Sequence, residues 1–160
     1  MFSVNDKIVY PMHGAGIIEK IEEKEVLGEV KKYYIMTAPN QNMQVMIPVE
    51  KSSVIGIREI VSKEEAAKVM DCLGSESTPM PDNWNRRYRE NVEKLKTGDI
   101  YAVAEVVRNL TRVDKIKKLS AGEKKLLNNA KQILVSELAL SFDKSDEDIY
   151  AEIMGKINIV

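Results

Sequence analysis

The hydrophobic pattern of this 160-residue chain changes its period once, at Ser62, and no other feature constrains the fold as strongly. Before Ser62, short apolar segments are separated by turn residues, a pattern that is typical of β-strands. After Ser62, apolar residues recur every three or four positions, as they do on the buried face of a helix. We therefore predict an α+β protein, with a β-domain over residues 1–60 and a helical domain over residues 61–160.

Five short strands are predicted in the N-terminal domain. Turn residues such as Pro11, Gly14 and Gly28 separate them, and the strands recur at the spacing of about eight to twelve residues that is typical of a small barrel. Because five strands of this length cannot form a large flat sheet, we expect a strongly curved barrel of the SH3-like or Tudor-like kind. The predicted strands are 7–10, 16–22, 31–37, 43–48 and a last one near 54–58.

Capping residues predict about five helices in the C-terminal domain. Ser62 with Glu65 has the spacing of a capping box, in which each side chain binds the main-chain N–H of the other residue. Ser120 with Glu123 has the same spacing and opens the longest apolar repeat, which runs to about Phe142. The other predicted N-caps are Asp82 or Asn83, Asp99 and Ser145, and the predicted stops are Gly74 and Gly98.

Few residues could support catalysis or bind a metal ion. His13 is the only histidine and Cys72 the only cysteine, so neither a Cys/His zinc site nor a disulfide can form within one chain. We expect a structural role for His13 in a turn and a small, buried, hydrophobic role for Cys72. The glutamates of residues 19–29 alternate with lysines and apolar residues, which favours a solvated hairpin face. No enzymatic activity, cofactor or metal is therefore predicted.

The ends of the chain and its hydropathy predict a location. The N-terminus has no basic region that leads into a long apolar segment, and no window approaches 18 uninterrupted apolar residues. A single cysteine is typical of a reducing compartment. We therefore expect a soluble cytoplasmic protein.

Charge is unevenly distributed along the chain. The formal net charge is only −1, but residues 82–136 hold thirteen Lys/Arg against seven Asp/Glu, a local charge of +6. The flanking segments 1–81 and 137–160 carry −3 and −4. Any affinity for nucleic acid is therefore expected to come from the middle of the chain.

Trp84, the only tryptophan, lies at a predicted helix start and is followed at once by arginines. On a helical wheel, Tyr88 and Leu95 fall within about 40° of Trp84, which favours a core position. In contrast, a first-turn side chain after a proline-bearing loop can overhang the bundle, where the helix N-terminus and the arginines would favour phosphate. Both interpretations remain open from the pattern alone: a core tryptophan, or an exposed wedge or interface anchor.

A second basic group lies on the helix that follows Ser120. Lys124, Asn128 and Lys131 fall within about 60° of one another, opposite the apolar arc. Taken alone, this pattern is typical of an ordinary solvated face. Together with the arginine-rich helix, it raises the hypothesis of one shared phosphate-binding surface.

Four segments of the chain carry a family resemblance, in the same succession and over nearly the whole length. They are "VNDKIVYPMHGAGIIEKIEEKEVLGEVKKYYIM", "NWNRRYRENVEKLKTGD", "VAEVVRNL" and "LSAGEKKLLNNAKQILVSELAL". Together they resemble the CarD/CdnL family of bacterial RNA polymerase-binding transcription regulators.

The resemblance implies a division of labour between the two domains. A Tudor-like N-terminal domain would dock on the β subunit of RNA polymerase, partly by strand pairing. The helical domain would contact promoter DNA at the upstream edge of the transcription bubble, where a tryptophan is wedged into the minor groove. The DNA-binding residues implied here are Trp84, Arg86, Arg87, Arg89, Lys124 and Lys125.

The polymerase-binding residues implied by the resemblance are Lys24, Val45, Met46 and Ile47. Family members often carry arginines on these strands. This chain keeps a cation at Lys24 without the bidentate fork of arginine, and Met46 carries no charge. The contact is thus expected at the same location with different pairwise detail.

The expected function is a transcription regulator that stabilises the promoter open complex through contacts that do not depend on base sequence. The protein would then be associated with the nucleoid through RNA polymerase. We expect a monomer, with a dimer formed by strand exchange as a second option. The alternative function is a protein-interaction adaptor without direct DNA contact, in which Trp84 is buried.

Overall fold

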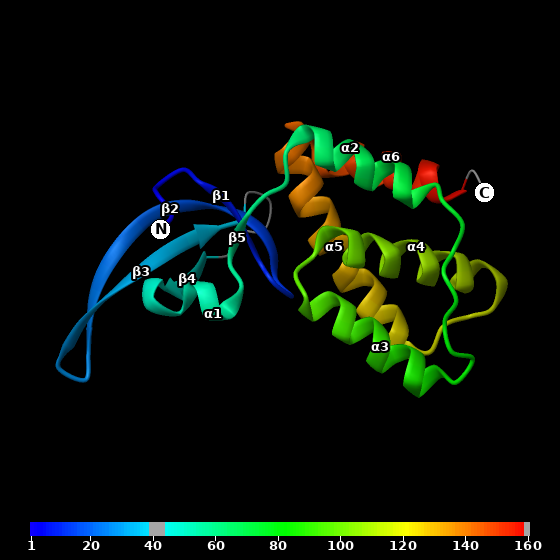
Figure 1. The fold of residues 1–160 in the computed structure, drawn as a ribbon, viewed down its shortest axis with the longest axis horizontal. Helices are drawn as coiled ribbons and strands as arrows, with labels where there is room; N and C mark the ends of the chain where they lie inside the picture. The colour runs from blue at the N-terminus through cyan, green and yellow to red at the C-terminus, as the bar shows by residue number, and fades with distance from the viewer. Residues whose placement is uncertain (39–43, 159–160) are drawn as a thin grey trace.

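The computed structural model describes residues 1–38 and 44–158. It contains a curved antiparallel sheet from the N-terminal residues and a helical bundle from the C-terminal residues, so the predicted α+β architecture is confirmed (Figure 1). The sheet and the bundle each enclose their own apolar core.

The sheet has five strands in the order β4-β3-β2-β1-β5, and all neighbours are antiparallel. Its core is built from side chains of alternating positions, including Ile8, Ile18, Tyr34 and Ile47. The strands are β1 (Lys7–Tyr10), β2 (Gly14–Val26), β3 (Glu29–Thr37), β4 (Gln44–Pro48) and β5 (Arg58–Glu59).

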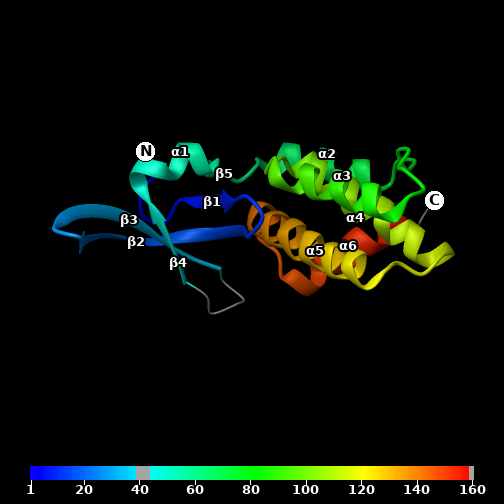
Figure 2. The same cartoon turned by 90° about the horizontal axis from the view of Figure 1, so that it is seen from below.

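Strands β2 and β3 are longer than predicted and form a hairpin that extends beyond the rest of the sheet (Figure 2). The predicted turn at Gly28 is confirmed, and its two central residues, Leu27 and Gly28, have φ angles of 52° and 81°. Positive φ at both positions gives the turn a twist that matches the twist of the flanking strands. This match allows pairing to continue to the tip, from Val26 opposite Glu29.

The predicted strand near 54–58 is wrong over most of its length. A short 3-10 helix, η1 (Val49–Lys51), runs into α1 (Ser52–Ile55), and only Arg58–Glu59 form a strand. Gly56 ends α1 with a φ of 92°, and the N–H of Gly56 donates to Ser52 O at 3.1 Å. The fourth predicted strand is confirmed over Gln44–Pro48, while its first residue, Met43, lies outside the described residues.

The five helices after Ser62 begin at or next to the predicted caps. Ser62, Asn83, Asp99, Ser120 and Ser145 each accept a hydrogen bond from a main-chain N–H of the helix that follows. The helices are α2 (Lys63–Leu73), α3 (Trp84–Lys96), α4 (Ile100–Ile116), α5 (Ala121–Phe142) and α6 (Asp146–Asn158).

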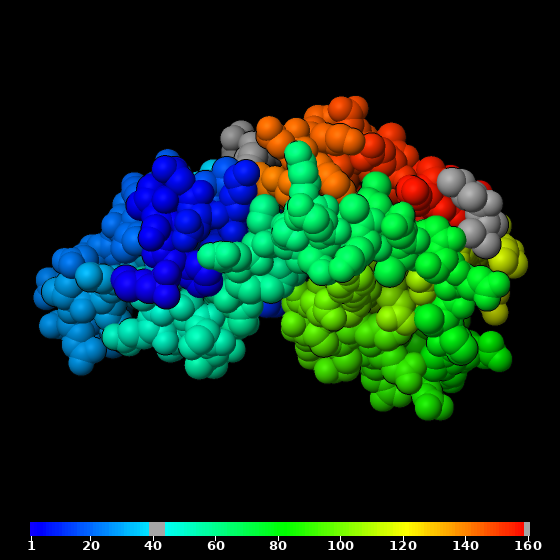
Figure 3. All heavy atoms as spheres, turned by 45° about the horizontal axis from the view of Figure 1, so that its top comes forward, coloured from blue at the N-terminus to red at the C-terminus, as the bar shows by residue number. Residues whose placement is uncertain are grey.

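A charged network joins the sheet to the bundle. The Arg58 guanidinium of β5 makes two parallel bonds to the Glu137 carboxylate of α5, at 2.7 and 2.8 Å, and also donates to Gly98 O. Glu137 accepts a third bond from the N–H of Val61, at 2.9 Å. Four donated hydrogen bonds thus fix Arg58 against one face of the bundle. The space-filling view shows the N-terminal and the helical parts in contact with each other (Figure 3).

Two glycines allow the close approach of the two parts. A Cβ at Gly14 would lie 2.8 Å from Ser136 Oγ of α5, where the neighbouring N–H of Ala15 donates to the same oxygen at 2.9 Å. A Cβ at Gly98 would lie 3.0 Å from Pro11, and Gly98 has a φ of 72°. Both positions therefore favour glycine through space as well as backbone conformation.

Candidate nucleic-acid interface

The loop of residues 74–82 leads to the start of α3, and polar side chains of α4 fix its path. Arg112 donates from Nη1 to Ser75 O at 2.6 Å. Asn109 donates from Nδ2 to Thr78 Oγ1 at 2.7 Å and accepts the N–H of Thr78 at 3.3 Å. Hydrogen bonds to α4 thus hold the loop that leads to the first residue of α3.

Trp84 is the first residue of α3, and 51% of its surface is exposed. The side chain of Asn83 caps the helix by accepting the N–H of Arg86 at 3.1 Å. Leu95, at the other end of α3, is fully buried in the core. The core position that the helical wheel favoured for Trp84 is therefore wrong, because a first-turn residue extends past the edge of the bundle.

Two of the three arginines near Trp84 are exposed. Arg86 has 70% of its side chain exposed, and its Nε is 3.9 Å from Glu90 Oε1. Arg89 is also exposed. At such a distance the exposed pair holds the Arg86 side chain only loosely. Arg86 and the exposed Arg89 can therefore both turn toward a phosphate.

Arg87 is placed differently from Arg86 and Arg89, because its side chain points into the bundle. Its Nε donates to Glu123 Oε2 at 2.7 Å and its Nη2 donates to Glu123 Oε1 at 2.8 Å. Arg87 is 7% exposed and Glu123 only 1%. The implied role of Arg87 as a phosphate contact does not fit this geometry, since its fork is already occupied by a carboxylate.

The ion pair shifts the pKa of both partners in the direction of charge. Hydrogen bonds from Arg87 hold the pKa of the Glu123 carboxyl below its usual value, although burial opposes this. The same hydrogen bonds raise the pKa of the Arg87 guanidinium. Both groups are therefore charged at neutral pH, and neither is left unpaired in the interior.

The start of α5 lies beside the start of α3. Besides the Arg87–Glu123 pair, a Cβ at Gly122 would lie 3.9 Å from the Tyr88 ring. Lys125 is exposed on this first turn of α5 and Lys124 is half-buried. Two helix N-termini, each with a partial positive charge, thus lie close together with cationic side chains around them.

Three further cations were missed by the sequence analysis. Lys115, Lys117 and Lys118 are all exposed and directly precede the cap of α5. Lys117 lines a groove together with Asp82 and Arg87, so it lies near the start of α3. The sequence signal for them was three lysines within four residues. Helical periodicity could not reveal it, because these lysines lie at the end of α4 and in the loop that follows.

The predicted polymerase-binding residues divide into two pairs. Lys24 of β2 and Met46 of β4 are exposed on the outer face of the sheet, and Lys24 Nζ is 3.7 Å from Met46 Sδ. Val45 is half-buried against the sheet core, and Ile47 is fully buried in it. The alternation of side chains along β4 explains the division, and it leaves Ile47 only its main chain for contact with a partner.

The tip of the β2–β3 hairpin carries further exposed apolar side chains. Leu27 is 100% exposed, and Val26 and Val30 near it are also exposed. β4 lies at one edge of the sheet, beside β3. An edge strand with exposed main-chain groups, next to exposed apolar side chains, is a surface that can accept a further strand.

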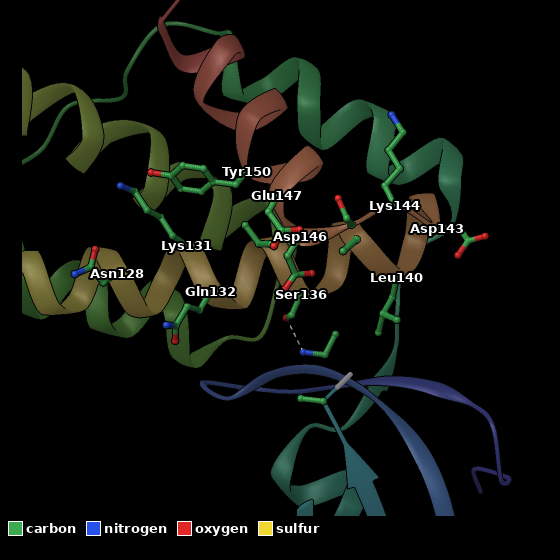
Figure 4. Close-up of a pocket in the computed structure, with 15 residues that line it drawn as sticks. Asn128, Lys131, Gln132, Ser136, Leu140, Asp143, Lys144, Asp146, Glu147 and Tyr150 are labelled. Atoms are coloured by element: carbon green, nitrogen blue, oxygen red, sulfur yellow. Dashed lines mark hydrogen bonds between the residues drawn. The ribbon is translucent and has the colours of Figure 1, made fainter. Parts of the chain in front are cut away.

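A separate groove lies between the start of β2, the middle and C-terminal part of α5 and the start of α6 (Figure 4). Its volume is about 750 Å³. Asn128 and Lys131 line this groove, and the Lys131 ammonium is 5.8 Å from the centre of the Tyr150 ring. The predicted basic face of α5 is thus divided, with Lys124 in the first turn and Asn128 and Lys131 in the groove.

His13 lies in a turn between β1 and β2. The N–H of His13 donates to Tyr10 O at 2.9 Å, and its exposed ring stacks edge-on with the Tyr10 ring. Cys72 is half-buried, with no disulfide. Residues 1–38 and 44–158 contain no group of three His, Cys, Asp or Glu placed to hold a metal ion. Over the same residues, every helix is too short or too polar to cross a membrane.

Comparison with known proteins gives matches over both parts of the chain. Residues 2–61 match the family model described as "CarD-like/TRCF RID domain", and residues 68–154 match the one described as "CarD, C-terminal domain". The chain is also 47% identical over 140 residues to the protein named "Putative transcription factor YdeB" from Bacillus subtilis (strain 168). That match covers 86% of this chain and 90% of the relative.

Proposed function

The chain belongs to the CarD/CdnL family of transcription regulators, and from this premise we propose that it docks on the β subunit of RNA polymerase and stabilises the promoter open complex. In this proposal residues 1–60 form the polymerase-binding domain and residues 61–160 the DNA-binding domain. Because RNA polymerase acts on the nucleoid, binding to it would place the protein at the nucleoid, in the cytoplasm.

The observation that carries the proposal is the position of Trp84. Half of this large apolar side chain is exposed at a helix start, with exposed Arg86 and Arg89 nearby. An aromatic ring in the minor groove can enter an opened base step and obstruct its closure. Cations around it hold the phosphates of the backbone without reading the bases.

The charge distribution supports weak binding to free DNA. The exposed cations around the proposed wedge are few, namely Arg86, Arg89 and Lys125, with Lys115, Lys117 and Lys118 beyond them. Phosphate contacts of this kind give an affinity that falls steeply with salt. Promoter selectivity must therefore come from the docked polymerase, which raises the effective concentration of Trp84 near the bubble.

Docking is proposed to use the outer face around Lys24 and Met46 together with the main chain of β4. Strand pairing along this edge would supply main-chain hydrogen bonds, and the exposed apolar residues of the hairpin would add buried area. Because Ile47 is fully buried, we propose no side-chain contact for it.

The direct test is Trp84→Ala, assayed in complexes of purified polymerase with promoter DNA. Since about 1.4 kcal/mol of preferential binding to the open state changes the open-to-closed ratio tenfold, we expect the open-complex lifetime to fall by about that factor. Affinity for polymerase, measured by fluorescence anisotropy of labelled protein, should stay unchanged.

Trp84→Phe serves as the matched variant, because it keeps an aromatic ring in the same place. We expect this variant to retain part of the effect. Equal lifetimes with the original protein and with Trp84→Ala would contradict the wedge and leave the adaptor function, in which the protein only docks.

A further inference from the structure

The two ends of helix α3 differ in the side chains that they bury fully. Its buried side chains are Arg87, Asn91 and Leu95, spaced four residues apart on one face. Of these, only Leu95 is apolar, and it lies in the last turn. The C-terminal end of α3 is therefore held by Leu95 in the core, whereas the end that carries Trp84 combines the half-buried ring of Tyr88, packed on the core, with the buried Arg87–Glu123 ion pair.

The ion pair is fixed from both sides. On the α5 side, the Glu123 carboxylate accepts a hydrogen bond from Ser120 Oγ at 3.2 Å, and Ser120 caps that helix. On the α3 side, Arg87 Nη1 lies 3.5 Å from the carbonyl oxygens of Pro81 and Asp82. One bidentate contact thus ties together the cap of α5, the first turn of α3 and the loop before it.

We propose that Arg87 and Glu123 are a positioning pair that fixes Trp84 relative to the cations at the start of α5. The inference rests on the proposed function, because it assigns these residues an effect on DNA without contact to it. Two parallel hydrogen bonds fix both the distance and the angle between the guanidinium and the carboxylate, whereas apolar contacts fix neither. Since a buried ion pair adds little net stability over apolar packing, orientation is the property that this pair supplies here.

The direction in which one substitution changes the open-complex lifetime separates this positioning role from a purely electrostatic role. Glu123→Gln removes a negative charge close to the proposed DNA surface. If Glu123 acted only through its charge, the substitution would strengthen DNA contact and lengthen the open-complex lifetime. If Glu123 positions α3 through Arg87, the same substitution would release the helix start and shorten the lifetime.

The experiment measures open-complex lifetime with full-length protein, purified polymerase and promoter DNA. We expect Glu123→Gln and Arg87→Lys each to shorten it by at least about threefold, the size that coupled neighbouring residues commonly show. Because Trp84 is the only tryptophan, its fluorescence anisotropy in the free protein gives an independent readout. That anisotropy should fall in both variants as the first turn of α3 loosens.

Two controls isolate positioning from other effects. Glu90→Gln removes an exposed negative charge from the same helix, and we expect an unchanged or longer lifetime. Ile153→Ala weakens the core at α6 and so shows what instability alone does to the lifetime. Thermal melting of every variant, followed by circular dichroism, verifies that the protein is folded at the assay temperature.

Three outcomes would overturn the inference: a Glu123→Gln lifetime equal to or longer than that of the original protein, unchanged Trp84 anisotropy, or an equal loss in Ile153→Ala. Its failure is distinguishable from failure of the proposed function. If Trp84→Ala shortens the lifetime and Glu123→Gln does not, only the positioning role is wrong. If Trp84→Ala has no effect, the wedge itself is wrong.

Discussion

Leu27 combines two features that rarely occur together in one residue. Its side chain is fully exposed at the hairpin tip, and its backbone has a φ of 52°. A residue with a Cβ is strained in this left-handed conformation by about 1–2 kcal/mol, but glycine has no Cβ, and asparagine offsets the strain because its short polar side chain hydrogen-bonds to the nearby backbone. Local stability would therefore favour another residue at this position, and an exposed leucine fits a site of contact with a partner.

Leu27→Asn should stabilise the protein. The substitution gives up no buried apolar area and relieves part of the backbone strain, so we expect a gain of about 0.5–1 kcal/mol in the free energy of unfolding. Urea unfolding monitored by circular dichroism measures it. Leu27→Ala keeps the strain and lacks the short polar side chain with which asparagine hydrogen-bonds to the nearby backbone, so it should show no comparable gain, and equal gains in the two variants would contradict the explanation.

Neighbouring residues of one type can have different roles, as Arg86, Arg87 and Arg89 show. The sequence predicted a cationic helix start, and two of its three arginines are indeed exposed. The burial of Arg87 depends on Glu123, which lies 36 residues further along the chain. No local pattern contains this pairing, because the glutamate also satisfied a capping box within its own helix.

At the scale of elements, the contact between α3 and α5 should make stability depend on pH. The pKa of Glu123 is lowered in the folded protein from its ordinary value of 4.5, mainly by hydrogen bonds from Arg87. The stabilisation that this group contributes is thus fully present above about pH 4.5 and is lost as the pH falls through the lower, folded pKa. Acid therefore weakens the link between the two helices.

The free energy of unfolding of Glu123→Gln, measured in urea at several pH values, tests this dependence. At pH 7 we expect the variant to be less stable by about 3 kcal/mol, because Arg87 is left buried without its carboxylate. The difference should shrink below pH 4, where the original carboxyl is also neutral. A difference that stays constant over this range would show that the ion pair does not determine it.

The sequence predicted helices better than strands, for physical reasons that particular elements illustrate. Helix starts are marked by side chains that cap their own backbone, and Ser62, Asp99 and Ser120 were identified in this way. The fifth strand was placed too early because the apolar residues Val54 and Ile55 also suit one turn of helix. Strand ends depend on a partner strand, so the pairing of β2 with β3 out to Val26 was not visible.

At the scale of the whole molecule, Arg58 links the sheet to the bundle. Its guanidinium binds Glu137 and Gly98, and Glu137 also accepts the N–H of Val61 at the connection between the two parts. No local sequence pattern indicates this network, because its members lie up to 79 residues apart. A charged residue in a two-residue strand resembles any exposed polar position.

Arg58→Ala should loosen this connection. Removal of the guanidinium leaves the buried Glu137 carboxylate without its cation, so we expect a loss of about 3 kcal/mol in the free energy of unfolding. Small-angle X-ray scattering should show a broader distribution of interatomic distances. The open-complex lifetime should fall although Trp84 and the docking surface are unchanged.

Arg86→Ala is the matched control for Arg58→Ala. It removes an exposed arginine that is only loosely paired, and its effect on unfolding should stay within about 0.5 kcal/mol. If Arg58→Ala leaves the scattering profile and the stability as they are in the control, the network does not hold the two parts together.

The glycines at positions 14 and 98 set how closely the sheet approaches the bundle, and this closeness limits the reach of the protein. If the molecule docks through the sheet, the indole ring of Trp84 lies at one fixed distance and in one fixed direction from the docking site. The protein would then select complexes by the distance between its docking site and the edge of the melted DNA. Promoter complexes whose melted edge falls at that distance would be retained, and those with a displaced edge would be passed over.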